Sequence, residues 1–130
     1  MSLTVSPDLL AQAERGHVAD DAFLACVRDS LPYAYDLVER LAGELPGTDR
    51  DFTDNLVPPP DDATQGQLLR AMASSAVRAA LERRFGVALA FQNCHRLAAF
   101  RPETIGGEQY QRFVSNESQV LNQQPEFVNC

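Results

Sequence analysis

The densest run of polar side chains within apolar sequence is Gln92-Asn93-Cys94-His95-Arg96. A thiol near an arginine and an imidazole can have a lowered pKa and become a nucleophile. Neighbouring residues point to opposite faces of a strand, however, and lie about 100° apart on a helix. We therefore interpret Cys94 and His95 as a half-buried thiol and a hydrogen-bonded histidine lining a turn. Two alternatives stay open: the five residues contact a ligand together, or Cys94 is a catalytic cysteine.

Arginine supplies all the basic residues, and it is concentrated in the second half of an acidic chain with a formal net charge of −7. Residues 1–62 carry a net charge of −9 and residues 63–130 a net charge of +2. This asymmetry favours two halves that fold together through complementary surfaces, with an anion or acidic-partner site on the second half as the alternative. Arg70 and Arg78 lie four-residue steps apart on one predicted helix face and are candidates for binding a protein partner.

Several kinds of chemistry have no supporting pattern. The paired cysteine spacing typical of zinc sites is absent, so we expect no metal site. Glycine-rich phosphate loops, a serine-centred elbow and paired catalytic carboxylates are also missing, and no cofactor is expected. The net charge argues against general nucleic-acid binding, which needs a surface that neutralises phosphates.

Helices are expected to position most of these residues. Ser6-Pro7-Asp8 supplies an N-cap, a proline suited to the first helical position and an acid near the positive end of the helix dipole. The apolar spacing over 20–45 predicts either one kinked helix or two helices that meet at Leu31-Pro32. Residues 46–61 form a loop rich in proline and aspartate. We expect three apolar side chains to attach this loop to the core: Phe52, Leu56 and Val57.

The strongest helix prediction covers residues 62–86, with a capping box from Asp62 and a left-handed stop at Gly86. Residues 87–91 alternate as a strand would, whereas 92–100 fit a strand or a helix equally well. A last helix follows between Tyr110 and Leu121, and residues 122–130 form a polar, mobile tail. The fold class is therefore mainly α: a small helical bundle around a long central helix, with a short β element at 87–100 as an added option.

Composition indicates one globular domain over residues 1–130, because 45% of the residues are hydrophobic. The sequence shows neither a signal peptide nor an apolar run long enough to cross a bilayer, so we expect a cytoplasmic protein without membrane contact. Cys26, Cys94 and Cys130 are interpreted as free thiols. The absence of lysine indicates a GC-rich genome.

Three stretches carry a resemblance to a known family. They are the run from Leu68 through Arg83-Arg84-Phe85-Gly86 to Arg96, the motifs Asp54-Asn55 and Pro58-Pro59-Pro60, and the ending Leu121-Asn122-Gln123. In these stretches the chain resembles a family of short, uncharacterised actinobacterial proteins of the Streptomyces type. The resemblance covers most of the chain, and it implies a host but no activity.

Two functions follow as hypotheses. The first is a non-enzymatic binding or regulatory module. It would bind an unknown protein partner or a second copy of itself through the alanine-rich helix expected over 62–86, or through the face of that helix that carries Arg70 and Arg78. The second is a small-molecule-binding or thiol-dependent protein, an enzyme included, with a pocket around Gln92–Arg96.

Overall fold

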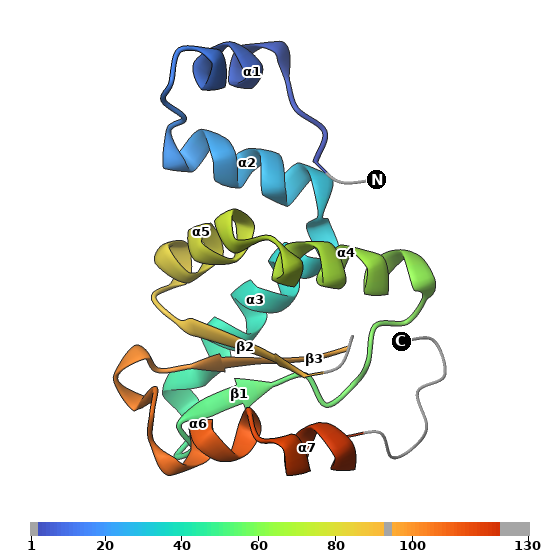
Figure 1. Cartoon of the computed structure of the whole chain (residues 1–130), viewed down its shortest axis with the longest axis vertical. Coiled ribbons are helices and arrows are strands. Elements are labelled where there is room, and N and C mark those ends of the chain that lie inside the picture. Colours follow the sequence, from blue (N-terminus) through green and yellow to red (C-terminus); the bar gives the residue numbers. More distant parts are fainter. Residues whose placement is uncertain (1–2, 93–94, 123–130) are drawn as a thin grey trace.

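The computed structural model describes residues 3–92 and 95–122, and it places a small antiparallel sheet among helices (Figure 1). Its helices are α1 (Pro7–Glu14), α2 (Asp20–Ser30), α3 (Pro32–Glu44), α4 (Asp62–Ala73), α5 (Ser75–Phe85), α6 (Glu108–Phe113) and α7 (Asn116–Leu121). Its strands are β1 (Phe52–Asp54), β2 (Ala88–Gln92) and β3 (Arg96–Phe100), and its 3₁₀ turns are η1 (Leu45–Gly47) and η2 (Pro102–Thr104). The fold is mainly α with a short β element.

The junction between α2 and α3 decides between the two alternatives for residues 20–45. Leu31 leaves helical geometry, with φ −129° and ψ 59°, and Pro32 begins α3. Proline has no N–H and its ring clashes with the preceding turn, so the first helix ends before it. The N–H of Tyr33 donates to the side-chain oxygen of Gln67 on α4 at 2.7 Å. This region therefore consists of two helices.

The prediction of one long central helix over 62–86 is wrong, because Ser74 divides this segment into α4 and α5. Ser74 has an extended backbone, with φ −93° and ψ 114°, and its hydroxyl accepts a hydrogen bond from the N–H three residues later. Serine hydroxyls compete with helical hydrogen bonding, and here the serine is the N-cap of α5. The expected capping box is present one residue earlier, with Asp61 rather than Asp62 as the N-cap. Gly86 ends α5 in the left-handed region at φ 65°, as expected.

The β element expected at 87–100 is the antiparallel hairpin of β2 and β3, so residues 96–100 are strand rather than helix. β3 is the central strand, because β1 pairs with its other edge and places Phe52 opposite Phe100. β1 corrects the prediction that 46–61 is entirely loop. Phe52 is buried there, whereas Leu56 and Val57 are 86% and 73% exposed and do not attach the segment to the core.

The two faces of the sheet pack against different parts of the chain. Leu89, Leu97 and Ala99 on one face join the main core with residues of α2, α3, α4 and α5. The opposite face carries the small residues Ala88, Ala90 and Ala98 beside two phenylalanines. Small side chains let another element approach closely, and α6 packs Phe113 against this face. The two faces of the sheet thus pack against different elements.

The last helix expected between Tyr110 and Leu121 is divided into α6 and α7. Ser115 separates them, and its hydroxyl accepts a hydrogen bond from the N–H of Ser118 at 3.1 Å to cap α7. Of the tail predicted over 122–130, residues 123–130 lie outside the described residues. Within the described part of the chain, no helix has both the length and the apolar character needed to cross a bilayer.

Candidate functional site

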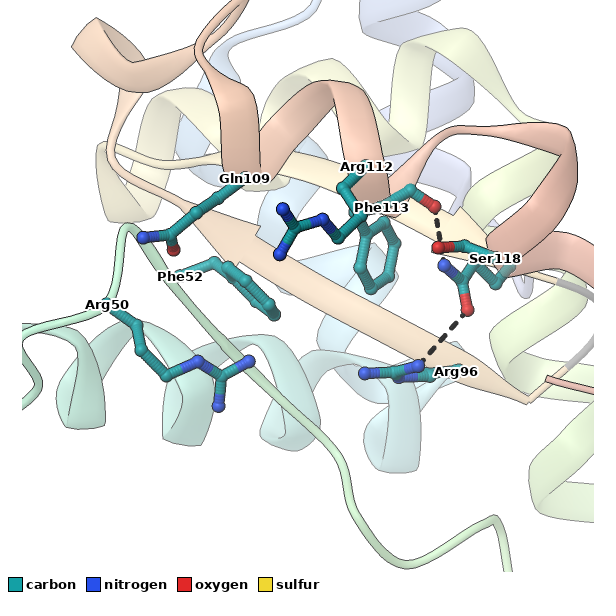
Figure 2. A pocket seen from close by; sticks show the side chains of 8 residues that line it. Arg50, Phe52, Arg96, Gln109, Arg112, Phe113 and Ser118 are labelled. Carbon is teal, nitrogen blue, oxygen red and sulfur yellow. Dashed lines mark hydrogen bonds between the residues drawn. The ribbon is translucent and has the colours of Figure 1, made fainter. Parts of the chain in front are cut away.

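A cavity of about 290 Å³ lies between α6, α7 and the sheet face that carries Ala88, Ala90 and Ala98 (Figure 2). We call it the arginine pocket, because three guanidinium groups lie around it. The lining residues come from the segment before β1, from each of the three strands, and from α6 and α7. They are Arg50, Phe52, Gln92, Arg96, Gln109, Arg112, Phe113 and Ser118. Segments far apart in the sequence therefore build one site.

Aromatic rings form the apolar part of the pocket. The Phe52 ring stacks on Phe100, with 4.6 Å between ring centroids, and meets Phe113 edge-on at 5.6 Å. Tyr110 packs edge-on against Phe100 from the same helix as Phe113. Such aromatic pairs stabilise the fold beyond the effect of their buried area. They fix the position of α6 on the sheet.

An ion pair with a buried carboxylate fixes Arg96. The side chain of Asp54 is only 2% exposed, and one of its carboxylate oxygens accepts hydrogen bonds from Nε and Nη2 of Arg96. A buried carboxylate is tolerated when a cation and hydrogen bonds compensate its lost hydration. Arg96 also donates from Nη1 to Gln92 at 3.4 Å, and its guanidinium carbon lies 5.2 Å from the centre of the Phe113 ring. Asp54 thus holds Arg96 at the pocket wall.

Gln92 connects the sheet to α6. Its side-chain nitrogen donates to the carbonyl of Phe113, while its side-chain oxygen accepts from Arg96. Gln92 lies opposite Arg96 in the register of β2 and β3, which explains why the two side chains share one face. With 2% of its surface exposed, Gln92 is part of the support of the pocket rather than of its rim.

Arg50 and Arg112 stand at the open side of the pocket. Arg50 lies over the Phe52 ring, 4.0 Å from its centre, and its Nη1 is 3.9 Å from the second oxygen of Asp54. Arg112 pairs with Glu108 at 2.8 Å, and both side chains are more than two-thirds exposed. Exposed ion pairs contribute little to stability, so the Arg112 guanidinium can reorient toward a ligand at low cost, while the contact of Arg50 with Asp54 is long, at 3.9 Å.

The structure brings together two of the five residues proposed for ligand binding, Gln92 and Arg96. His95 is 5% exposed and does not line the arginine pocket. Burial, and then the charge of Arg96, lower the pKa of His95, so its imidazole is neutral at pH 7. Asn93 and Cys94 lie outside the described residues, so the structure leaves their predicted roles open.

Asn55 positions the start of β3 next to the pocket. Its side-chain nitrogen donates to the carbonyl of His95 at 2.7 Å, and its side-chain oxygen accepts from the N–H of Leu97 at 2.7 Å. Asn55 itself is 5% exposed. Because these bonds flank Arg96 on both sides, they fix the strand from which that guanidinium projects.

The other two predicted site residues, Arg70 and Arg78, lie on α4 and α5, so the break at Ser74 separates them and removes the continuous helix face that was expected. Both are half-buried. The Arg70 guanidinium folds back over Gly66, where an added Cβ would lie 3.3 Å from its Nη1. Neither residue lines the arginine pocket.

Most of the pocket was missed from the sequence: Arg50, Phe52, Gln109, Arg112, Phe113 and Ser118. Two weak signals point to it. Phe52 and Asp54 alternate as on a strand face, and residues 109, 112 and 113 have the three-and-four spacing of a helix face. Among the described residues no group of three or more His, Cys, Asp or Glu side chains could hold a metal ion.

The whole chain, residues 1–130, matches the family model KH_NucS_shadow, described as NucS shadow ORF. The chain belongs to this family. No curated protein and no solved structure matches it significantly. The description of the NucS shadow ORF family names neither a ligand nor a reaction. The chemistry of the arginine pocket is therefore the basis on which a function can be proposed.

Proposed function

We propose that this member of the NucS shadow ORF family is a non-enzymatic binding module that holds a small anionic ligand in the arginine pocket. The observation that carries the proposal is the convergence of Arg50, Arg96 and Arg112 from three separate segments on one cavity. Guanidinium groups present several donors in a plane and bind carboxylates and phosphates with directed, charge-assisted hydrogen bonds. The cavity volume is at the lower end of the range for small-molecule pockets.

The side chains at the pocket support binding rather than catalysis. Arginine stays protonated at neutral pH, and glutamine does not ionise, so neither can take up a proton from a substrate. Ser118 is the one hydroxyl among the described lining residues, and those residues include no carboxylate or imidazole that could activate it. The neutral imidazole of His95 is buried away from the pocket. A thiol-dependent activity at Cys94 is the alternative, and it stays a prediction.

A nucleic-acid strand fits the chain less well than a small ligand. KH modules, whose letters appear in the family name, clamp a nucleic-acid backbone with a GXXG loop. The chain has seven glycines, and no two of them have this spacing. Its net charge of −7 also opposes general attraction to phosphate backbones.

The remaining expectations have narrower support. Binding of a protein partner or of a second copy at Arg70 and Arg78 stays a proposal, and the half-buried state of both side chains reduces the surface available for it. A cytoplasmic location in an actinobacterial host is likewise a proposal, supported by the use of arginine without lysine and by cysteines without a paired framework.

A titration followed by NMR tests the binding function. Benzoate and phenyl phosphate are added separately to the ¹⁵N-labelled chain, and the side-chain amide signals of Gln92 and Gln109 are recorded. We expect saturable shifts with at least one anion, and their loss in the double variant Arg50→Gln/Arg112→Gln. If neither anion gives saturable shifts at millimolar concentration, the proposed function is wrong.

The chain offers a matched control. Arg83 pairs with Asp20 at 3.0 Å with both side chains exposed, as Arg112 does with Glu108. Arg84 lies over the Phe85 ring, as Arg50 lies over Phe52. The double variant Arg83→Gln/Arg84→Gln therefore also removes two positive charges, together with a similar ion pair and a similar ring contact, but at a distance from the pocket. It should bind as the unaltered chain does; an equal loss would show that only the overall charge matters.

A further inference from the structure

The formal charges around the arginine pocket do not balance. Three guanidinium groups line it, and one buried carboxylate, that of Asp54, contacts two of them. Glu108 is not part of the lining and pairs with Arg112 from the exposed helix surface. Among the described lining residues, two positive charges therefore have no carboxylate inside the cavity, and Glu108 pairs with one of them, that of Arg112, from outside it. An occupant that takes Arg112 from the exposed Glu108 and compensates both charges carries two negative charges.

The three arginines differ in how firmly they are held. Asp54 and Gln92 together engage Nε, Nη1 and Nη2 of Arg96, so this guanidinium is a fixed wall. Within the described residues, the carboxylate oxygen next to Arg50 lies 3.9 Å away, and the carboxylate partner of Arg112 is exposed. Figure 2 shows the guanidinium groups of Arg50 and Arg112 on either side of the Phe52 ring. Two cations with reorientable donors, placed on opposite sides, suit a tetrahedral group with several acceptor oxygens.

The rings specify the rest of the ligand. Phe52 and Phe113 line the same cavity (Figure 2), and a small apolar surface of each stays exposed, 8% for Phe52 and 4% for Phe113. Free phosphate would leave this surface exposed to water, whereas a phosphate ester of a ring compound would cover it. The side-chain amide of Gln109, whose oxygen accepts from the N–H of Asp51, and the hydroxyl of Ser118 add neutral hydrogen-bonding groups to the lining.

We infer that the arginine pocket binds a small phosphomonoester dianion that carries a flat apolar or aromatic group. Arg50 and Arg112 contact the phosphate oxygens, and Phe52 and Phe113 contact the ring. This inference rests on the proposed function, because it specifies the ligand of the same pocket. It requires two charges, a tetrahedral group and a ring in one molecule.

Four probes separate these requirements in calorimetric titrations with the unaltered chain. Phenyl phosphate has all three features, phenyl sulfate has one charge only, benzoate has one charge on a planar group, and inorganic phosphate has no ring. We expect phenyl phosphate to bind roughly tenfold tighter than each of the others, the gain of about one additional charge-assisted hydrogen bond or ring contact. In Arg50→Gln and in Arg112→Gln this preference over phenyl sulfate should fall to about twofold or less.

Each contrary result has a distinct meaning. Equal affinity for phenyl sulfate would overturn the charge argument, and equal affinity for inorganic phosphate would overturn the ring argument. Tightest binding of benzoate would overturn the phosphomonoester while leaving an anion-binding function in place. If none of the four probes binds, the proposed function fails together with the inference. The Arg83→Gln/Arg84→Gln control should keep the preference of the unaltered chain.

Discussion

At the residue scale, two adjacent buried polar side chains, Asp54 and Asn55, organise the pocket end of the sheet. Asp54 is the ion-pair partner of Arg96, and Asn55 bonds to the backbone on both sides of that arginine. Both side chains are at most 9% exposed. Each therefore exchanges hydration for specific partners, and the structure has little tolerance for removal of either partner.

The substitution Asn55→Ala should destabilise the chain by about 2–4 kcal/mol, because it leaves the carbonyl of His95 and the N–H of Leu97 buried without their side-chain partner. Urea unfolding followed by circular dichroism measures the loss. Asn116→Ala on the exposed start of α7 is the matched control and should cost less than about 0.5 kcal/mol. Similar losses in the two variants would show that the Asn55 bonds contribute nothing specific.

The sequence pointed to the segment Gln92–Arg96, two of whose residues, Gln92 and Arg96, line the candidate pocket. The chemistry suggested by adjacent Cys94 and His95 stays a prediction, because Cys94 lies outside the described residues and His95 does not line the pocket. Gln92 and Arg96 face it because they are cross-strand neighbours, a relation that needs the register of a hairpin. Their partners Asp54 and Phe113 lie far away in the sequence, and local patterns carry no information about such contacts.

At the element scale, the interruption between α4 and α5 changes how the central helices pack. The capping signals near 61 and 86 were predictable, since they depend on local backbone chemistry. The break at Ser74 was not, because apolar and alanine residues continue at helical spacing on both sides of it. β1 was missed for a similar reason. It has three residues and exists only because β3 offers an edge for pairing.

Ser74→Ala should destabilise the chain by about 1 kcal/mol, because the N-cap of α5 loses the acceptor for the Val77 N–H. Ser75→Ala is the matched control: the residue is exposed, is the first residue of α5 and gains helix propensity from the change. Thermal unfolding of both variants checks the difference. A Ser75→Ala variant that is as unstable as Ser74→Ala would show that the cap is not the cause.

At the scale of the whole molecule, the arginine pocket is a local reversal of charge on an acidic chain. At physiological salt the screening length is about 8 Å, so the acidic first half of the chain weakens the attraction of an anion only over short distances. Under the proposed function, we therefore expect contacts within the pocket, rather than long-range steering, to determine ligand recognition. This fits a module that selects a small anion and rejects long polyanions, which would also meet the acidic surface.

Stability should be uneven across the molecule, lowest in α1 and highest in β3. Leu9 is the one buried residue of α1, whereas Leu97, Ala98, Ala99 and Phe100 of β3 have no exposed surface. Elements with few buried contacts open locally, and central strands open only when the whole chain unfolds. Native-state hydrogen exchange should therefore give α1 amides a much lower opening free energy than β3 amides.

Two truncations test this order of stability. Leu9→Ala removes the main contact of α1, so it should speed exchange in α1 and leave the β3 amides unchanged. Leu97→Ala creates a cavity in the core that both sheet and helices share, and it should lower the protection of β3 by about 2–5 kcal/mol. If Leu9→Ala instead lowered protection in β3 as much as in α1, α1 would belong to the cooperative core. Leu9→Ala would then also loosen the strand that carries Arg96, and the binding of phenyl phosphate would weaken.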